Sequence, residues 1–159
     1  MKLSTKGRYA VMAMVDIAAH TEGKPIALAD IAERQEISLS YLEQLFGKLR
    51  RGGQVNSVRG PGGGYLLARS ADETRISDII LAVDEPIKAT RCTPPSPLGC
   101  KSNKSRCLTH DLWQELGNKI SLYLNSVTLA DVVEKRILGS SGELHRREQD
   151  QNSAIAAAQ

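Results

Sequence analysis

The sequence predicts a mainly α-helical protein with one small β-hairpin and a long helix in its second half. Three features indicate this fold: amphipathic helical repeats, two short strand-like runs around a glycine-rich tip, and an extended apolar stripe late in the chain. With 159 residues, 41% of them hydrophobic, the chain is expected to form one globular domain with an appended helix. Aromatic residues make up only 4%, so a mainly aliphatic core is expected.

The first two helices are predicted from apolar spacing and from residues that begin or end helices. A helix is expected to start after Ser4, its N-cap, and to run to about His20. A short strand is expected at residues 26–28, and a short second helix at residues 30–35. The chain therefore begins with one long and one short helix.

A third helix is expected to follow Ser38, as its N-cap, and to run to about Arg51. At 100° per residue, its apolar residues fall on one side; these are Leu42, Leu45, Phe46 and Leu49. The opposite side carries Ser40, Glu43, Gln44, Gly47 and Arg51. Such side chains are suited to reading base edges in a major groove, although an ordinary solvated helix face has the same composition.

A β-hairpin is expected after the third helix. Two strand-like runs, 54–59 and 65–68, flank a tip at 60–64 that contains four glycines. Helix, turn, helix and hairpin in this order are typical of a winged helix-turn-helix domain, in which Arg59 would reach a minor groove of DNA. No Gly-Lys-Ser/Thr follows the glycines, which argues against a Walker-type phosphate loop.

The second half of the chain is expected to contain three further helices. A short one is predicted to start with Ser77 as its cap and to end at Pro86. A long one is predicted from Thr109, as its cap, to about Asn125. Its apolar stripe is broad enough to predict self-association, and it consists of Leu112, Trp113, Leu116, Ile120, Tyr123 and Leu124.

A final short helix is expected from Thr128, with Asp131 completing a capping box, to about Ile137. From Gly139 the sequence is polar and weakly patterned, so disorder is expected there.

All three cysteines and one histidine lie in one segment, with the spacing Cys92-x7-Cys100-x6-Cys107-x2-His110. The intervening prolines, glycine and serines predict an exposed loop, which a bound metal or cluster would order. Three thiolates and an imidazole suit both zinc and a 2Fe-2S cluster. Zinc sites usually have closer ligand pairs, and a redox-sensing or incidental group of cysteines is the third alternative.

The distribution of charge favours a polyanionic partner for the first half. Residues 1–70 carry ten Lys or Arg against six Asp or Glu, a charge of +4, whereas the remainder carries −1. The residues expected to read bases are Ser40, Glu43, Gln44 and Arg59. Those expected to contact the DNA backbone or to form the wing are Lys6, Arg8, Tyr9, Ser38, Tyr41, Arg50, Arg51, Gly60 and Pro61.

Lys6 and Arg8 lie in the first helical turn, where cations oppose the helix dipole unless an anion lies nearby. Phosphate contact is one interpretation, and two solvated surface charges are the other.

Other functional classes receive little support from the sequence. No nucleotide fingerprint, catalytic triad or supported pair of carboxylates appears, so no catalytic residues are assigned and no enzyme is expected. No apolar stretch approaches 18 residues, and the beginning of the chain lacks the features of a signal peptide, so a cytoplasmic protein without membrane contact is expected.

The chain resembles the IscR family of bacterial iron-sulfur cluster regulators, which are winged-helix transcription factors. The matching stretches are LSTKGRYAV at 3–11, SLSYLEQLF at 38–46, SVRGPGGGYLL at 57–67, AVDE at 82–85, ATRC at 89–92 and CLTHDLW at 107–113. The resemblance implies one 2Fe-2S cluster per subunit, with the ligands Cys92, Cys100, Cys107 and His110. The segment between the first and third cysteines is longer than expected for this family, although the order of the ligands is kept.

The resemblance also implies the partners of the protein. They are double-stranded DNA at palindromic promoter sites and a second copy of the chain, with RNA polymerase or cluster assembly proteins as further candidates. Control of genes for iron-sulfur cluster assembly is implied, and we expect cluster occupancy to alter the preference for DNA sites. A winged-helix regulator with a Cys3His zinc site or a thiol redox site is the alternative.

The expected organisation has four parts: a winged helix-turn-helix domain at 1–84, a cysteine-rich loop at 85–110, a dimerisation helix with a short closing helix at 109–138, and a tail at 139–159.

Overall fold

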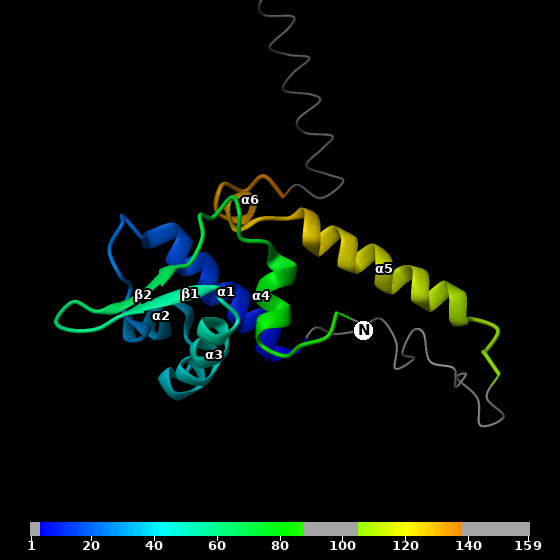
Figure 1. The fold of residues 1–159 in the computed structure, drawn as a ribbon, viewed down its shortest axis with the longest axis horizontal. Coiled ribbons are helices and arrows are strands. Elements are labelled where there is room, and N and C mark those ends of the chain that lie inside the picture. The colour runs from blue at the N-terminus through cyan, green and yellow to red at the C-terminus, as the bar shows by residue number, and fades with distance from the viewer. Residues whose placement is uncertain (1–3, 88–104, 138–159) are drawn as a thin grey trace, which may run out of the picture.

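The computed structural model describes residues 4–87 and 105–137 (Figure 1). Within these residues the chain forms six helices and one two-stranded sheet. In chain order they are α1 (Thr5–His20), α2 (Leu28–Gln35), α3 (Leu39–Arg51), β1 (Val55–Val58), β2 (Gly64–Leu67), α4 (Ile76–Ala82), α5 (His110–Ser126) and α6 (Leu129–Val133). This architecture is the predicted mainly α fold with one hairpin.

Helix α1 forms the centre of the core and packs against α2, α3, α4 and α6. It begins where predicted, because the Ser4 side chain accepts a hydrogen bond from the Lys6 backbone N–H. Its core side chains include Met14 and Ile17, which are fully buried. The predicted apolar side of α3 is buried against them, and consists of Leu42, Leu45, Phe46 and Leu49. Ser38 occupies the N-cap position of α3, but its side chain makes no capping hydrogen bond.

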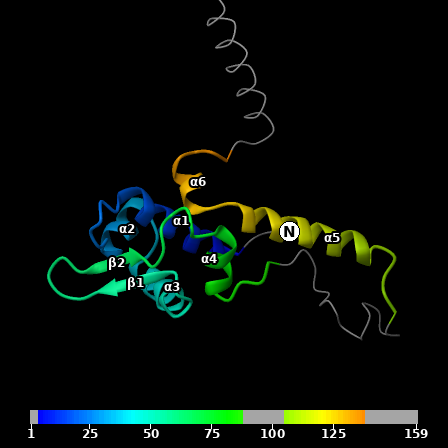
Figure 2. The ribbon, with the colours of Figure 1, turned by 45° about the horizontal axis from the view of Figure 1, so that its top comes forward.

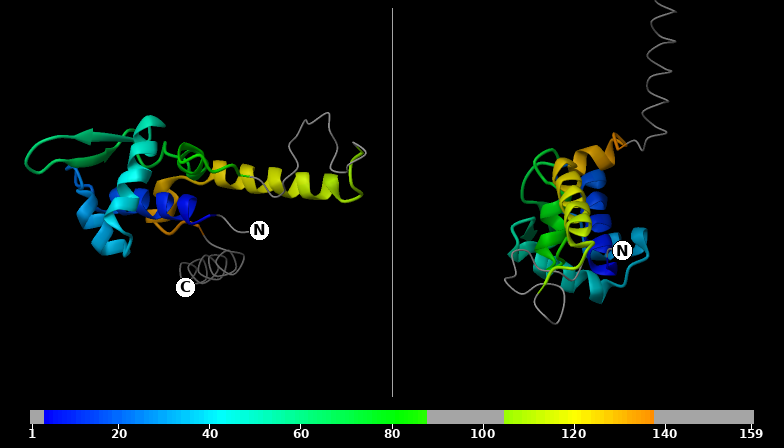
Figure 3. Two further views of the ribbon diagram at one scale, coloured as in Figure 1. Left: turned by 90° about the horizontal axis from the view of Figure 1, so that it is seen from below. Right: turned by 90° about the vertical axis from the view of Figure 1, so that its right-hand side faces the viewer.

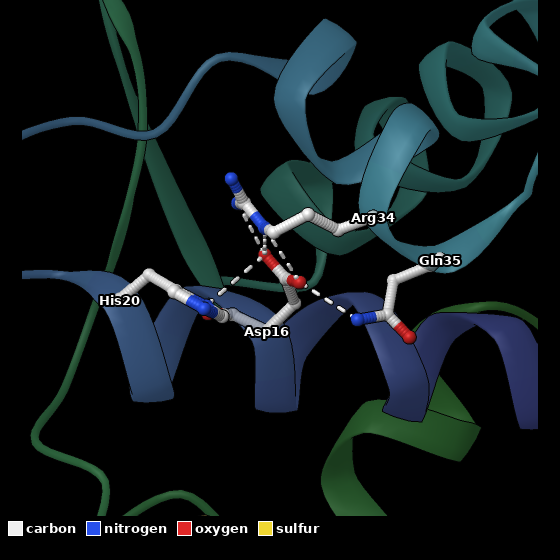
Figure 4. A network of polar contacts seen from close by, with 4 residues as sticks. All are labelled: Asp16, His20, Arg34 and Gln35. Atoms are coloured by element: carbon white, nitrogen blue, oxygen red, sulfur yellow. Dashed lines mark hydrogen bonds and ion pairs between the residues drawn. The ribbon is translucent and has the colours of Figure 1, made fainter.

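A buried carboxylate joins α1 to α2 (Figure 4). The side chain of Asp16 is fully buried, and Arg34 donates to both of its oxygens, from Nη2 to Oδ1 at 2.6 Å and from Nε to Oδ2 at 3.0 Å. Gln35 Nε2 donates to Oδ2 at 2.7 Å, and His20 Nδ1 lies 3.6 Å from Oδ1. Burial alone would raise the pKa of Asp16, but these hydrogen bonds and the charge of Arg34 lower it below its usual value. The network therefore holds α1 and α2 together.

The hairpin is antiparallel, with Val55 opposite Leu67 and Val58 opposite Gly64. Residue 64 must be glycine, because a Cβ there would lie 2.2 Å from the carbonyl oxygen of Ile26. The expected strand at 26–28 is wrong: Ile26 forms a single bridge to Tyr65, and Leu28 already begins α2. This bridge attaches the hairpin to the helical body.

Helix α4 begins earlier than predicted, at Ile76, with Arg75 at its N-cap. Ser77 is therefore no cap; it is buried inside the helix, and its hydroxyl donates to Asn125 Oδ1 at 3.2 Å. The expected capping box of Thr128 and Asp131 is confirmed, but α6 ends at Val133, four residues before the predicted end.

Helix α5 extends away from the helical body, on the side opposite the hairpin tip (Figures 1 and 2). None of its 17 residues is buried. Its last turn is attached to α4, where Arg75 Nη1 donates to the Asn125 carbonyl oxygen at 2.6 Å. The helix therefore has a fixed base and a projecting far end, which Figure 3 shows from two further directions. Within residues 4–87 and 105–137, no helix has the length and apolar character needed to cross a membrane.

Candidate nucleic-acid interface and metal ligands

The polar side of α3 is exposed as predicted. Ser40, Glu43 and Gln44 are all exposed, and helical spacing places Glu43 and Gln44 one turn beyond Ser40. Arg59 is exposed at the end of β1, next to the tip that contains Gly60 and Pro61. The two elements that a winged helix-turn-helix domain uses to contact DNA therefore both present polar or basic side chains to solvent.

Two of the residues predicted to contact the DNA backbone also pack against each other. The rings of Tyr9 and Tyr41 meet edge to face, with centroids 6.0 Å apart and an interplanar angle of 82°. Both residues are half-buried, so they join α1 to α3. Arg8, Ser38, Arg50 and Arg51, by contrast, are exposed.

The N-terminus of α1 holds an internal anion. The carboxylate of Glu85 accepts hydrogen bonds from the Ser4 and Gly7 backbone N–H groups, at 2.6 and 2.7 Å, and from the Ser4 hydroxyl. A methyl group at residue 7 would lie 2.6 Å from Glu85 Oε2, so the contact requires glycine there. Burial would raise the pKa of Glu85, but these hydrogen bonds lower it below 4.5. Lys6 and Arg8 in the first turn oppose the dipole of α1, and the carboxylate of Glu85 is the nearby anion that offsets them.

The residue before Glu85 contacts α3. The Asp84 carboxylate accepts a hydrogen bond from Lys48 Nζ at 2.8 Å, and Lys6 Nζ lies 3.5 Å from the Asp84 carbonyl oxygen. The hydrogen bond and charge of Lys48 lower the pKa of Asp84, and the charges of Lys6 and Arg51 act in the same direction. Neither Asp84 nor Lys48 was among the residues predicted from the sequence. The only available signals were the basic run that begins at Lys48 and the AVDE stretch.

Two of the four predicted metal ligands lie within the described residues, at the start of α5. Cys107 and His110 are both half-buried, and the His110 backbone N–H donates to the Cys107 carbonyl oxygen at 3.1 Å. A turn of the backbone thus places the two residues next to each other at the N-terminus of α5. Cys92 and Cys100 lie outside the described residues.

The surroundings of these two ligands are polar. His110 Nε2 lies 3.1 Å from Gln114 Oε1, an interaction that fixes the orientation of the imidazole ring. Thr109 stands at the N-cap position as predicted, but it makes no capping hydrogen bond; its hydroxyl accepts from Trp113 Nε1 at 3.2 Å and lies 3.8 Å from Cys107 Sγ.

The sequences of known transcriptional regulators are similar to most of this chain. The HTH-type transcriptional regulator IscR of Klebsiella pneumoniae (strain 342) is 50% identical over 154 residues, which cover 96% of this chain and 93% of the relative. IscR of Serratia proteamaculans is 55% identical over 136 residues, 86% of this chain and 81% of the relative.

Solved structures of two regulators are also similar to this chain. T. potens IscR is 39% identical with a TM-score of 0.69, covering 86% of this chain and 89% of that one. CymR (YrzC), the global cysteine regulator of B. subtilis, is 32% identical with a TM-score of 0.70, covering 85% and 98%.

These relatives are transcriptional regulators, so the protein is a DNA-binding regulator and not an enzyme. The model of the family described as "Rrf2: Iron-dependent Transcriptional regulator" matches residues 3–135. The chain therefore belongs to the Rrf2 family of transcriptional regulators.

Proposed function

We propose that this protein is an iron-sulfur cluster sensor of the cytoplasm that controls genes for cluster assembly. Each subunit of a homodimer would hold one 2Fe-2S cluster through Cys92, Cys100, Cys107 and His110. The observation that carries the proposal is the position of Cys107 and His110, which lie next to each other at the start of α5, the helix that projects from the DNA-binding body. The iron dependence in the description of the family supports it.

The two described ligands fit such a cluster. A thiolate and an imidazole are both established ligands of 2Fe-2S centres, and Gln114 holds the ring of His110 in place. The cluster would supply an iron-sulfide core that forms when iron and sulfide are available and is lost to oxidants. The protein residues bind this core and fix the start of α5.

The exposed face of α5 supports a homodimer. Leu112, Leu116 and Tyr123 keep 63%, 38% and 54% of their surface exposed, and helical spacing places them on one side. An apolar pocket of about 240 Å³ lies at the base of the helix and is lined mainly by Val11, Met12, Ile76, Ile80 and Leu124. A second copy of α5 is the simplest way to cover so much apolar surface.

Helix α5 leads from the two ligands to its base, and hydrogen bonds connect that base with the DNA-binding helices. Asn125, at the base of α5, forms hydrogen bonds with Arg75 and Ser77 at the start of α4. After α4, Glu85 forms hydrogen bonds with α1, and Asp84 forms one with Lys48 of α3. A change at the start of α5, or in the segment that leads to Cys92, can therefore alter the orientation of the two DNA-binding heads. Because two heads must reach half-sites about 34 Å or a multiple apart, a small rotation changes which sites fit.

Within each head, we propose that Ser40, Glu43 and Gln44 read base edges and that Arg59 enters the minor groove. The carboxylate of Glu43 is repelled by DNA unless it accepts from cytosine N4. Glu43 therefore excludes sites that offer no such donor.

A panel of promoter duplexes tests this function. Anaerobically purified protein and the Cys92→Ala variant are expected to rank the duplexes differently, because only the former holds the cluster. Glu43→Ala is expected to reduce the discrimination by about 1–3 kcal/mol per site, the range for one base contact. Relative affinities from fluorescence anisotropy measure both effects. Identical rankings for the wild type and Cys92→Ala would refute control of site preference by the cluster.

A further inference from the structure

The carboxylate of Asp84 lies beside cations of α1 and α3. Lys48 Nζ is 2.8 Å from Asp84 Oδ2, and the charges of Lys6 and Arg51 also act on this carboxyl group. Lys48 follows the base-reading candidate Gln44 by four residues, so it lies one turn further along α3, at the edge of its polar side. The carboxylate of Asp84 is thus paired with a cation next to the side of α3 that carries the base-reading candidates.

The backbone holds this carboxylate in place. Asp84 has a left-handed conformation, with φ of 56°, which aspartate tolerates better than most residues do. The following residue, Glu85, is buried and bonded to the N-terminus of α1. Although its own side chain is 75% exposed, Asp84 is therefore presented to Lys48 from a fixed backbone.

We propose that Asp84 is an internal substitute for a DNA phosphate, which occupies Lys48 in the free protein and must be displaced when DNA binds. The ion pair between Lys48 and Asp84 is exposed and therefore weak, so a DNA phosphate can readily displace the Asp84 carboxylate. The effect is to lower the affinity for DNA of any sequence, which suits a regulator that must leave non-specific sites to find its promoters. The proposal rests on DNA binding by the family and not on the cluster.

The salt dependence of non-specific binding distinguishes this role from a structural one. Asp84→Asn keeps the size of the side chain and a residue that tolerates the left-handed conformation. It is expected to tighten binding to a random-sequence duplex about fivefold, the upper range for an exposed ion pair. The slope of log K against log salt is expected to become steeper by about one, because in the wild type the displaced carboxylate takes up a cation from solution when DNA binds, and in Asp84→Asn it does not.

Two further variants make the test specific. Asp78→Asn removes another carboxylate, on α4, which is paired with Arg69 at 3.2 Å, and it is expected to change neither affinity nor slope. In a Lys48→Gln background, Asp84→Asn is expected to lose its effect, since the cation it releases is absent. Circular dichroism melting checks that all variants are folded.

The proposal is overturned by any of three results: Asp84→Asn binds no tighter than the wild type, Asp78→Asn tightens binding equally, or Asp84→Asn acts equally in the Lys48→Gln background. The last two would indicate a general effect of net charge.

Discussion

Leu112→Glu combined with Leu116→Glu is expected to convert the proposed dimer to a monomer. The two leucines lie one turn apart on the exposed apolar face of α5, at 63% and 38% exposure. In the proposed dimer each is buried, which contributes about 1.5–3 kcal/mol per side chain, and two carboxylates would have to be buried in their place. Light scattering after size-exclusion chromatography measures the mass directly.

Loss of the dimer is expected to weaken binding to a duplex with two half-sites by at least about 100-fold, because the second head no longer binds as part of the same molecule. Binding to a single half-site is expected to be unchanged, since α1 to α4 are untouched. The matched control is Asn118→Glu, which adds a carboxylate on the opposite side of α5. A wild-type protein that is monomeric, or a double variant that remains dimeric, would contradict the assignment of this face.

Asp16→Asn is expected to lower the free energy of unfolding by about 3 kcal/mol at neutral pH, which is at the low end for breaking a buried ion pair. The low end applies because the Arg34 side chain is 34% exposed and regains contact with water. The amide has nearly the same shape as the carboxylate, but it cannot accept from Arg34 and Gln35 with both oxygens. Urea denaturation measures the change.

The difference between the wild type and Asp16→Asn is expected to depend on pH. Because the pKa of Asp16 is lowered below 3.8 in the folded protein, the carboxylate contributes its full stability above about pH 5, and this is lost as the pH falls through the folded-state pKa. The two proteins should therefore approach each other in stability below about pH 4. Glu33→Gln, an exposed charge change on α2, is the control, and we expect less than about 0.5 kcal/mol from it. A pH-independent difference would contradict the ionised state of Asp16.

Local signals in the sequence predicted most of the fold. The Ser4 cap, the two sides of α3 and the capping box at Thr128 each depend on residues within one or two helical turns, and all three are confirmed. The start of α4 was predicted wrongly because serine is a common N-cap residue. The hydroxyl of Ser77 instead donates to Asn125, which is 48 residues away. A buried serine and a capping serine look alike in the sequence.

On the functional surface, too, local spacing predicts some features, whereas contacts between distant residues are not predictable. The exposed positions of Ser40, Glu43 and Gln44 follow from helical spacing alone, and the structure confirms that they are exposed. The contacts of Glu85 with α1 and of Asp84 with α3 could not be predicted, because the residues they join are 78 and 36 positions apart. No periodic pattern connects residues at such separations; only the folded chain brings them together.

The iron and acid-labile sulfide content of protein purified without oxygen tests the proposed cluster most directly. Cys107 and His110, together with Cys92 and Cys100, predict about two iron and two sulfide ions per subunit, with the visible absorption of a 2Fe-2S centre. Replacing any of the four ligands by alanine should reduce this content strongly. Protein that contains zinc and no sulfide, or no metal at all, would contradict the cluster and leave a DNA-binding regulator with a different signal.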